Sequence, residues 1–522
     1  MTATKRTEET SSAANGLLVA FGCIAIVAVV AEATLGPFVS QISLVERGAR
    51  ALAVAGALGA LHLGAREVFG HRFVRDTKGY AVVYLLSAVS VVCVAFVHLI
   101  ALALVHYCNA NVVQSEILES SLPFVLPFAA MVLVVQSMLG VSFGVLAGLV
   151  AAVVYGSYAL HPVLLLGALL SSSVAASVAF RRVRSRACYI RAGIRIGYAM
   201  LPFALLSLVL VPPSGAFDIG VRCLGCFVSG CLSSIIAVIV TPIVEYFAGY
   251  ASDMRLIEMA TLDHPLLKEL SIQAPGTWNH SMVIGMMVES AADAIGANPV
   301  VCRVGAYFHD IGKVKKPLYF VENQTPGDNR HDKLSPSMSA LIIRAHVKDG
   351  VDLVRRHKVP KVIEDMIPQH HGTSVIDYFY DKARKEAEEL GHDPDAVDRA
   401  LYQYPGPKPQ TREAGLLMLA DGIEAAARTL SEPTQDRIQG LVQKMLNKVF
   451  ASGELHECDL TLQDLHIIAK CFTRVLTGIY HQRIAYSEPA EKGASGNESR
   501  EGVRGDDSTQ APRENLRRLG IE

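Results

Sequence analysis

Long uncharged apolar runs fill the first half of the chain, and amphipathic segments with helical spacing fill the second. The apolar runs end near residue 248. A helix of about 20 apolar residues crosses the roughly 30 Å hydrocarbon core of a bilayer. The change of pattern therefore predicts two halves in different solvents: a polytopic transmembrane helical bundle, followed by a domain in water.

Eight apolar runs approach the length of a membrane span. They cover residues 16–36, 51–65, 80–107, 122–138, 140–160, 162–180, 193–212 and 217–248. The stretch 122–160 is about twice as long as one span, so the chain must fold back between Gln136 and Gly140. The run 51–65 is short unless the arginines at both its ends reach the interface. We expect eight spans and leave open whether 51–65 crosses.

Lys and Arg residues gather in some loops and are missing from others. Residues 66–78 contain three Arg and one Lys, and residues 181–191 contain five Arg, whereas 108–121 and 213–216 contain neither. Positively charged loops usually face the cytoplasm. This predicts that both termini and the second half lie in the cytoplasm. External loops of about fourteen residues are too short for a folded external domain.

Beyond residue 249, apolar residues recur three and four positions apart, with no competing β-alternation. The amphipathic stretch from Pro242 predicts that the last span runs on into a coupling helix. Residues 404–410 (YPGPKPQ) predict a rigid loop before the next helix. The expected fold class is all-α, with a transmembrane bundle and a cytoplasmic helical domain. We divide the chain into a disordered tail (1–15), a membrane domain (16–248), a cytoplasmic domain (249–487) and a second disordered tail (488–522).

Composition agrees with a membrane protein. The 522 residues are 51% hydrophobic, and the mean hydropathy is +0.33. A formal net charge of −1 gives no general argument for a nucleic acid polymer as partner. Seven of the ten Cys lie in the apolar half, and the CxxC at 223–226 is part of an apolar run. We interpret these Cys as small buried hydrophobes and expect no disulfide framework.

Histidines and aspartates recur between Trp278 and Asp421 in a pattern that packing alone does not require. Its centre is a vicinal His-Asp pair among apolar residues, followed by Gly-Lys; both side chains would be buried and need partners. Imidazole together with carboxylate suits Fe, Mn, Zn or Ni more than Ca or Mg. The seven candidate ligands are His280, His309, Asp310, His346, His370, His371 and Asp421.

Two vicinal pairs favour a site for two metal ions. Adjacent residues on a helix point about 100° apart, so His309–Asp310 and His370–His371 cannot each aim at one ion as i and i+4 residues would. At a helix end, such a pair can serve two neighbouring ions, with a carboxylate bridging them. Two ions about 3.5–4 Å apart activate a shared water and neutralise phosphoryl oxygens, which predicts phosphoester hydrolysis. Lys313 would place a cation on a phosphate oxygen.

The ordered ligands resemble those of the HD phosphohydrolase superfamily. Longer phrases resemble the seven-transmembrane HD family of membrane-bound cyclic di-AMP phosphodiesterases: QAPGTWNHS, RVGAYFHDIGK, YFVENQ, HDKLSPSMSALII, AHVKDGV, QHHGTS, YPGPKPQTREA and MLADGIEAAAR. The resemblance is dense from about 240 to 485 and architectural in the apolar half, where it implies that the eight spans divide into one plus seven. Two features depart from the family. Asn279 stands where many relatives have a second His, and only residues 37–49 stand where relatives carry a large extracytoplasmic domain.

The resemblance implies a ligand set, a reaction and a location. One ion would be held by His280, His309, Asp310 and Asp421, and the other by His346, His370 and His371, with Asp310 bridging. The two divalent ions would be Fe or Mn, and water would attack cyclic di-AMP in line to give linear pApA. Catalytic roles would fall to His309, Asp310 and Lys313. The candidate nucleotide contacts are Lys313 and four residues in family phrases: Tyr319, Asn323, Lys333 and Lys408. For Lys333 and Lys408 the alternative is that they are ordinary solvated surface lysines. The implied location is the bacterial inner membrane.

Two other functions stay open. Hydrolysis of cyclic di-GMP or guanosine tetraphosphate would use the same ligands, although HHGTS lacks the acidic and Gly-Tyr-Pro signature of the cyclic di-GMP branch. A receptor or transporter that binds nucleotide without cutting it would be favoured by a missing ligand, and none of the seven is missing. The expected partners are the lipid bilayer and a cyclic dinucleotide. We also keep open a second copy of the chain, in a homodimer.

Overall fold

The computed structural model describes residues 3–36, 43–75, 77–107, 121–158, 161–179, 186–325, 327 and 329–480. Within these ranges the regular structure is helical, and one isolated bridge joins Val375 to Gln403. The predicted all-α fold class is confirmed. The predicted tail at 488–522 lies outside the described residues.

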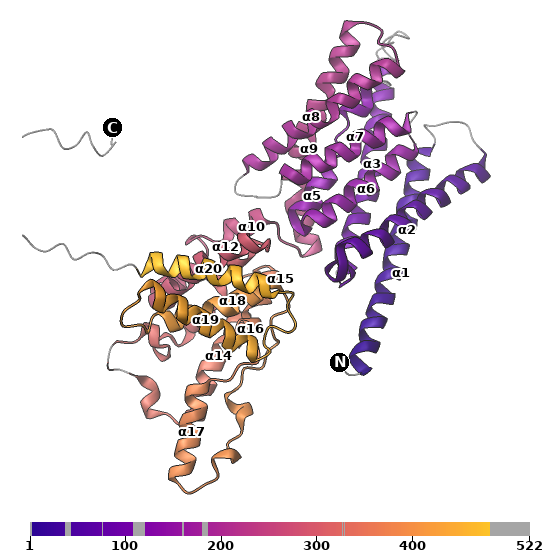
Figure 1. The fold of residues 1–522 in the computed structure, drawn as a ribbon. Helices are drawn as coiled ribbons and strands as arrows, with labels where there is room; N and C mark the ends of the chain where they lie inside the picture. The colour runs from indigo at the N-terminus through magenta and orange to yellow at the C-terminus, as the bar shows by residue number, and fades with distance from the viewer. Residues whose placement is uncertain are drawn as a thin grey trace, which may run out of the picture. The chain divides into compact units, whose positions relative to one another are not determined.

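The N-terminal half is a set of apolar helices (Figure 1). They are α1 (Ala3–Thr34), α2 (Leu44–Arg75), α3 (Thr77–Tyr107), α5 (Ala130–Leu139), α6 (Val141–Ser157), α7 (Pro162–Ala179), α8 (Ala187–Leu210) and α9 (Ala216–Ala248). Six segments of the described chain are long and apolar enough to cross a membrane. Two shorter apolar helices, Val141–Ser157 and Val163–Ala179, occupy two further predicted runs. The protein is a multi-pass membrane protein.

Two details of the N-terminal half differ from expectation. Residues 3–15, expected to be disordered, continue helix α1; extending an existing helix adds one hydrogen bond per residue without a new nucleus. The run 51–65 is only the middle of α2, where Leu44–Phe69 forms a 26-residue candidate span. Arg50 does not mark its end, because its Nε and Nη2 donate to Glu32 on α1, each at 2.8 Å. The predicted turn is present at Gly140 (φ +83°), between α5 and α6.

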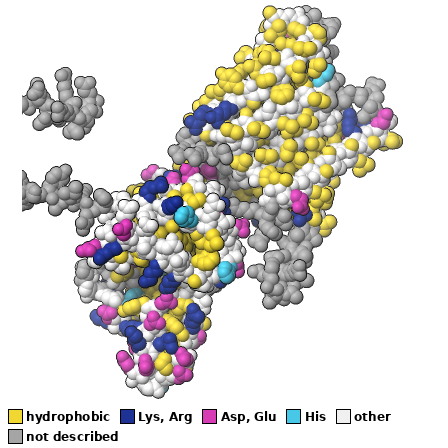
Figure 2. Space-filling view, in the orientation of Figure 1, with side chains coloured by type: hydrophobic (Ala, Val, Ile, Leu, Met, Phe, Trp, Pro, Cys, Tyr) yellow, Lys and Arg dark blue, Asp and Glu magenta, His cyan; other side chains and the backbone are white. Residues whose placement is uncertain are grey.

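The surfaces of the two halves differ in kind. On the face in Figure 2, hydrophobic side chains cover most of the N-terminal half, whereas basic and acidic side chains are interspersed over the C-terminal half. Exposed large apolar residues recur along the helices of the first half, as at Val209 (76%) and Phe247 (81%). Lipid is the environment in which such a surface is stable.

The C-terminal half is built from shorter helices (Figure 1). They are α10 (Asp253–Met259), α11 (Pro265–Gln273), α12 (Pro275–Ile295), α13 (Pro299–Phe308), α14 (Pro336–Arg356), α15 (Lys361–Glu364), α16 (Met366–Gln369), α17 (Asp377–Glu389), α18 (Arg412–Ala427), α19 (Gln435–Ala451) and α20 (Leu462–Ile479). Helix α12 packs against α13, α18 and α20. Helix α14 packs against a short 3-10 helix, η2 (Ile311–Lys315).

The predicted continuation of the last span into a coupling helix is wrong in detail. Helix α9 ends at Ala248, and Gly249 adopts a left-handed conformation with φ +71°. A separate helix, α10, begins after Ser252, whose side chain accepts a hydrogen bond from Arg255 N. A left-handed glycine ends one helix and a serine cap starts the next, so periodicity alone could not reveal the break.

Candidate metal centre

The structure brings all seven predicted ligands together, from five helical segments. His280 lies inside α12, His346 inside α14 and Asp421 inside α18. The two vicinal pairs lie at helix ends, as predicted: His309 caps the C-terminus of α13, and His370 caps that of α16. Two groups form, and within each the ligand atoms lie within 4.8 Å of one another: His280, His309, Asp310 and Asp421, and His346, His370 and His371.

Asp310 lies between the two groups. Its Oδ2 is 3.2 Å from His309 Nε2 and 3.7 Å from His280 Nε2. Its Oδ1 is 3.4 Å from His346 Nε2 and 3.8 Å from His370 Nε2. A carboxylate whose two oxygens face different ligand groups has the geometry of a bridge between two cations.

Three of the imidazoles are oriented by the helical turn that precedes them. The Nδ1 atoms of His309, His346 and His370 each lie within 2.5–2.7 Å of the carbonyl oxygen three residues earlier. A carbonyl oxygen only accepts, so each Nδ1 carries the proton and donates it. In the neutral ring the lone pair is then on Nε2, which faces the centre.

Burial keeps three imidazoles neutral. It lowers the pKa of His346 and His370 and lowers the pKa of His371 to about 3, despite nearby carboxylates that favour the charged form. His371 also stacks on the ring of Tyr404, with centroids 4.2 Å apart. Neutral imidazole is the form that binds a metal.

The other group is more strongly charged. Burial opposes ionisation of Asp310, but His309 and Lys313 outweigh it and hold the carboxyl pKa well below its usual range. His280 and His309 do the same for the pKa of Asp421. Burial disfavours protonated His309, yet Asp310 and Asp421 raise its pKa to about 10. A cation at Nε2 would replace that proton, because a metal ligand must be deprotonated.

The residues at the centre fit a divalent cation. His309 Nε2 and Asp310 Oδ1 are buried and have no hydrogen-bond partner among the described residues. Buried polar atoms without a partner cost roughly 1–3 kcal/mol each. Imidazole nitrogens and carboxylate oxygens are the donor set that first-row transition metals favour.

Lys313 lies beside the carboxylate of Asp310. Its Nζ is 2.6 Å from Asp310 Oδ2 and 2.8 Å from Glu322 Oε1. Burial opposes its charge, but Asp310 and Glu322 outweigh burial and raise the pKa of the ammonium. Glu322 is held in turn by the Thr277 hydroxyl at 3.0 Å. A permanent cation is therefore held at the edge of the ligand groups.

Gly312 permits the close approach that joins the two groups. A Cβ at this position would collide with the carbonyl oxygen of His346. The glycine of the HDIGK phrase thus lets η2 lie directly against α14, so that Asp310 comes within reach of His346.

The four remaining predicted nucleotide contacts have varied surroundings. Asn323 Oδ1 accepts from the backbone N of Gly276 and Thr277, at 3.0 and 3.2 Å, and so caps α12. Lys408 Nζ donates to the Gly453 carbonyl at 2.9 Å. The Tyr319 ring lies under the Arg330 guanidinium, 6.0 Å from its centroid. Lys333 is exposed. The structure thus gives Asn323 and Lys408 contacts that stabilise the domain itself.

Three residues at the centre were missed from the sequence. Glu424 contacts His280 Nδ1, and Tyr404 stacks on His371. Glu454 accepts from Thr373 N at 2.9 Å and from its hydroxyl at 2.6 Å, and so holds the loop after His371. Glu424 lies one helical turn after Asp421, on the same face of α18, and this spacing could have identified it from the sequence. Glu454 is 81 residues from its partner and leaves no local signal.

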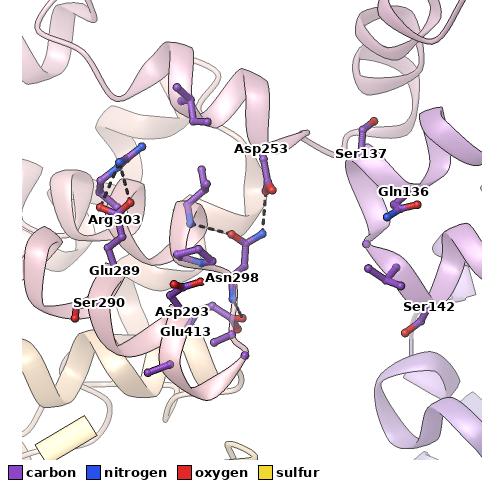
Figure 3. Close-up of a pocket in the computed structure, with 18 of the residues that line it drawn as sticks. Gln136, Ser137, Ser142, Asp253, Glu289, Ser290, Asp293, Asn298, Arg303 and Glu413 are labelled. Carbon is purple, nitrogen blue, oxygen red and sulfur yellow. Dashed lines mark hydrogen bonds and ion pairs between the residues drawn. The ribbon is translucent and has the colours of Figure 1, made fainter. Parts of the chain in front are cut away.

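Asn298 ties together the starts of two ligand-bearing helices (Figure 3). Its Oδ1 accepts from Val300 N and Val301 N, which caps α13. Its backbone N donates to Glu413 Oε1, in the first turn of α18, at 3.0 Å. Its Nδ2 donates to Asp253 Oδ1 on α10 at 2.9 Å. Through its side chain and its backbone N, Asn298 therefore joins the starts of α13 and α18, which carry His309 and Asp421 further along.

Known proteins share both halves of this arrangement. Residues 45–252 match the family model described as 7TM receptor with intracellular HD hydrolase, and residues 277–426 match the HD domain. The cyclic-di-AMP phosphodiesterase PgpH of Bacillus subtilis is 41% identical over 290 residues, which are 55% of this chain and 40% of that protein. The PgpH protein of Listeria monocytogenes is 39% identical over 322 residues, 61% of this chain and 44% of that one. The chain thus spans less than half the length of these two relatives.

A solved structure is also similar. It is the L. monocytogenes phosphodiesterase PgpH HD domain in complex with cyclic-di-AMP, with 43% sequence identity and a TM-score of 0.40, covering 43% of this chain and 100% of that one. The HD domain implies divalent metal binding. Along its length the chain is thus similar first to the seven-transmembrane receptors with an intracellular HD hydrolase and then to the HD domain itself.

Proposed function

We propose that the protein is a membrane-anchored phosphodiesterase that hydrolyses cyclic di-AMP to linear pApA. The observation that carries this proposal is the position of Asp310, whose two oxygens face two separate ligand groups. That arrangement suits a pair of cations, and paired cations are used to hydrolyse phosphoesters. Relatives that are 41% and 39% identical are named cyclic-di-AMP phosphodiesterases.

The proposed ligands are the seven predicted ones. His280, His309, Asp310 and Asp421 would hold one cation, and His346, His370 and His371, with Asp310, the other. The mixed imidazole and carboxylate donors suit Fe, Mn, Zn or Ni, and the resemblance to membrane-bound cyclic di-AMP phosphodiesterases favours Fe or Mn among them. Bound divalent cations would lower the pKa of a water and neutralise phosphate oxygens.

The protein's own residues would bind and orient the substrate. Lys313 would turn its ammonium from Glu322 toward a phosphate oxygen, as a charge-assisted hydrogen bond. Both side chains are largely buried: that of Asp310 is 1% exposed and that of Lys313 is 12% exposed. Such burial strengthens electrostatic contacts with a phosphate. Tyr319 and Lys333 stay proposed nucleotide contacts, and Asn323 and Lys408 would first have to give up the hydrogen bonds described above.

We also propose a bacterial inner-membrane location with the C-terminal half in the cytoplasm. Arginine-rich loops on one side of the apolar helices support this orientation. It would give the HD domain access to an intracellular nucleotide. A homodimer stays part of the proposal and is tested by the mass of the detergent-solubilised protein.

Turnover of three nucleotides by the full-length protein tests the function. The purified protein is loaded with Mn²⁺ or Fe²⁺ and given cyclic di-AMP, cyclic di-GMP or guanosine tetraphosphate. We expect pApA from cyclic di-AMP, and none from the Asp310→Asn variant. Turnover of another nucleotide alone would reject the substrate. Inactivity of the metal-loaded protein on all three would favour a receptor that binds without cutting.

A further inference from the structure

His280 is oriented differently from the other buried imidazoles. His309, His346 and His370 each direct Nδ1 at a backbone carbonyl of the preceding turn. His280 instead directs Nδ1 at Glu424 Oε2, and the two side chains come from different helices. An ionised partner stabilises an imidazole more strongly than a carbonyl does, because its hydrogen bond is charge-assisted.

Glu424 is placed to act on His280 from the side away from the centre. Its side chain is 1% exposed, and its other oxygen, Oε1, pairs with Arg428 Nε at 3.1 Å. His280 Nε2 then faces the centre, 3.0 Å from Asp421 Oδ1. A carboxylate on the far nitrogen of a metal-binding histidine fixes the ring and raises its basicity.

Both aspartates belong to the group of His280 and His309, but each also approaches an imidazole of the other group. Asp310 approaches imidazoles of both groups, as described above. Asp421 does the same, since its Oδ1 faces His280 while its Oδ2 lies 3.5 Å from His371 Nδ1. Glu424 contacts His280, in the group that already contains both aspartates. The charge of Glu424 therefore adds to the difference in charge between the two groups.

We propose that Glu424 is a positioning residue that strengthens one of the two cation positions and so widens the difference between them. The position with His280, His309, Asp310 and Asp421 binds tightly and fills first. The position with His346, His370 and His371 binds more weakly and fills second. This inference rests on the two-cation site of the proposed function, but it concerns metal affinity and needs no nucleotide.

Titration of the full-length protein with Mn²⁺ alone tests the proposal, with free Mn²⁺ followed by electron paramagnetic resonance. The wild type should show two classes of site. Glu424→Gln, which keeps the shape and removes the charge, should weaken the tight class roughly 10–100-fold and leave the weak class unchanged. Glu413→Gln is the matched control, because Glu413 is a buried carboxylate on the same helix that accepts from Asn298 N. It should leave both classes as in the wild type.

A second variant tests the order of filling without touching Glu424. His346→Ala should abolish the weak class and retain one Mn²⁺ at the wild-type tight affinity. Equal affinity of both positions in the wild type, unchanged affinities in Glu424→Gln, or loss of the tight class in His346→Ala would each overturn the proposal. Failure of nucleotide turnover alone would reject the proposed reaction and leave these binding results standing.

Discussion

At the scale of single residues, the centre is shaped by what each imidazole does with its second nitrogen. A carbonyl oxygen holds Nδ1 of His309, His346 and His370, so that Nε2 faces the carboxylates. Asp310 lies between the two groups, with one oxygen facing each. Removing Asp310 should therefore affect both metal positions, whereas removing one histidine should affect one of them.

Asp310→Ala and His309→Ala test this difference directly. We expect Asp310→Ala to lose both cations. Its turnover of cyclic di-AMP should fall by at least about a thousandfold, because several kcal/mol of charge stabilisation disappear. His309→Ala should also abolish turnover while losing mainly one cation. Metal content and hydrolysis rate are measured on protein whose helical content matches the wild type by circular dichroism. Retained activity in either variant would refute the ligand assignment.

Gly312→Ala tests the contact between η2 and α14. The added methyl group would meet the His346 carbonyl oxygen, so one of the two segments must move. We expect a loss of about 1–3 kcal/mol in the free energy of unfolding and weaker Mn²⁺ binding. Gly440→Ala on α19, where a Cβ would meet nothing within 4 Å, is the control. Equal stability and Mn²⁺ affinity in both variants would show that the approach is not needed.

At the scale of elements, local capping chemistry fixes where helices start. Asn298, Thr411 and Ser335 cap α13, α18 and α14, the helices that bring His309, Asp421 and His346 to the centre. Thr461 and Asp464 form a reciprocal cap at α20: Asp464 N donates to the Thr461 hydroxyl oxygen, and Asp464 Oδ2 accepts from Thr461 N. Such caps contribute roughly 0.5–2 kcal/mol each.

Asp464→Asn should lower stability in a pH-dependent way. Burial raises the pKa of Asp464, but hydrogen bonds from Thr461 and the charge of Arg412 outweigh burial and hold the pKa below its usual range. A carboxyl group with a lowered folded-state pKa stabilises the fold above its unfolded pKa, and that stabilisation is lost as pH falls through the folded value. We expect a loss of about 1–2 kcal/mol at pH 7 that shrinks below pH 4. Thermal unfolding of both proteins between pH 7 and pH 3 measures it; a constant difference would contradict the assignment.

At the scale of the whole molecule, cation binding and folding are linked. The ligands come from α12, α14, α18 and the ends of α13 and α16, and unfolding would separate all of them. A ligand that binds only the folded state stabilises it by mass action. Trp278, the single Trp of the chain, lies two residues before His280 and packs near Tyr307, with ring centroids 5.7 Å apart. Its emission therefore reports on this domain within the full-length protein.

Removal of divalent cations should destabilise the C-terminal half. Mn²⁺ at about 100 times its Kd should add roughly 2.7 kcal/mol for each site, and a chelator should remove that gain. The unfolding temperature followed by Trp278 emission measures the shift. Asp310→Ala should show almost no response to Mn²⁺. A wild-type protein whose unfolding temperature ignores both Mn²⁺ and chelator would contradict a metal centre at these residues.

The sequence by itself determined the apolar helices, the all-α class and the seven candidate ligands. Each of these is a local property: a run of apolar residues, a helical period, or a donor type beside another in a short phrase. Vicinal pairs at helix ends were also predictable, and the structure has His309 and His370 at such ends.

Only the tertiary structure decided which distant groups meet. Glu424 contacts His280 from 144 residues away, and Glu454 holds Thr373 from 81 residues away. Arg50, which the pattern places at the edge of a span, pairs with Glu32 on another helix. The break after α9 likewise depends on Gly249 and a serine cap within an otherwise continuous amphipathic pattern. Periodicity records which face of a helix is buried, but a buried charge finds its partner across the fold, and that pairing leaves no trace in spacing along the chain.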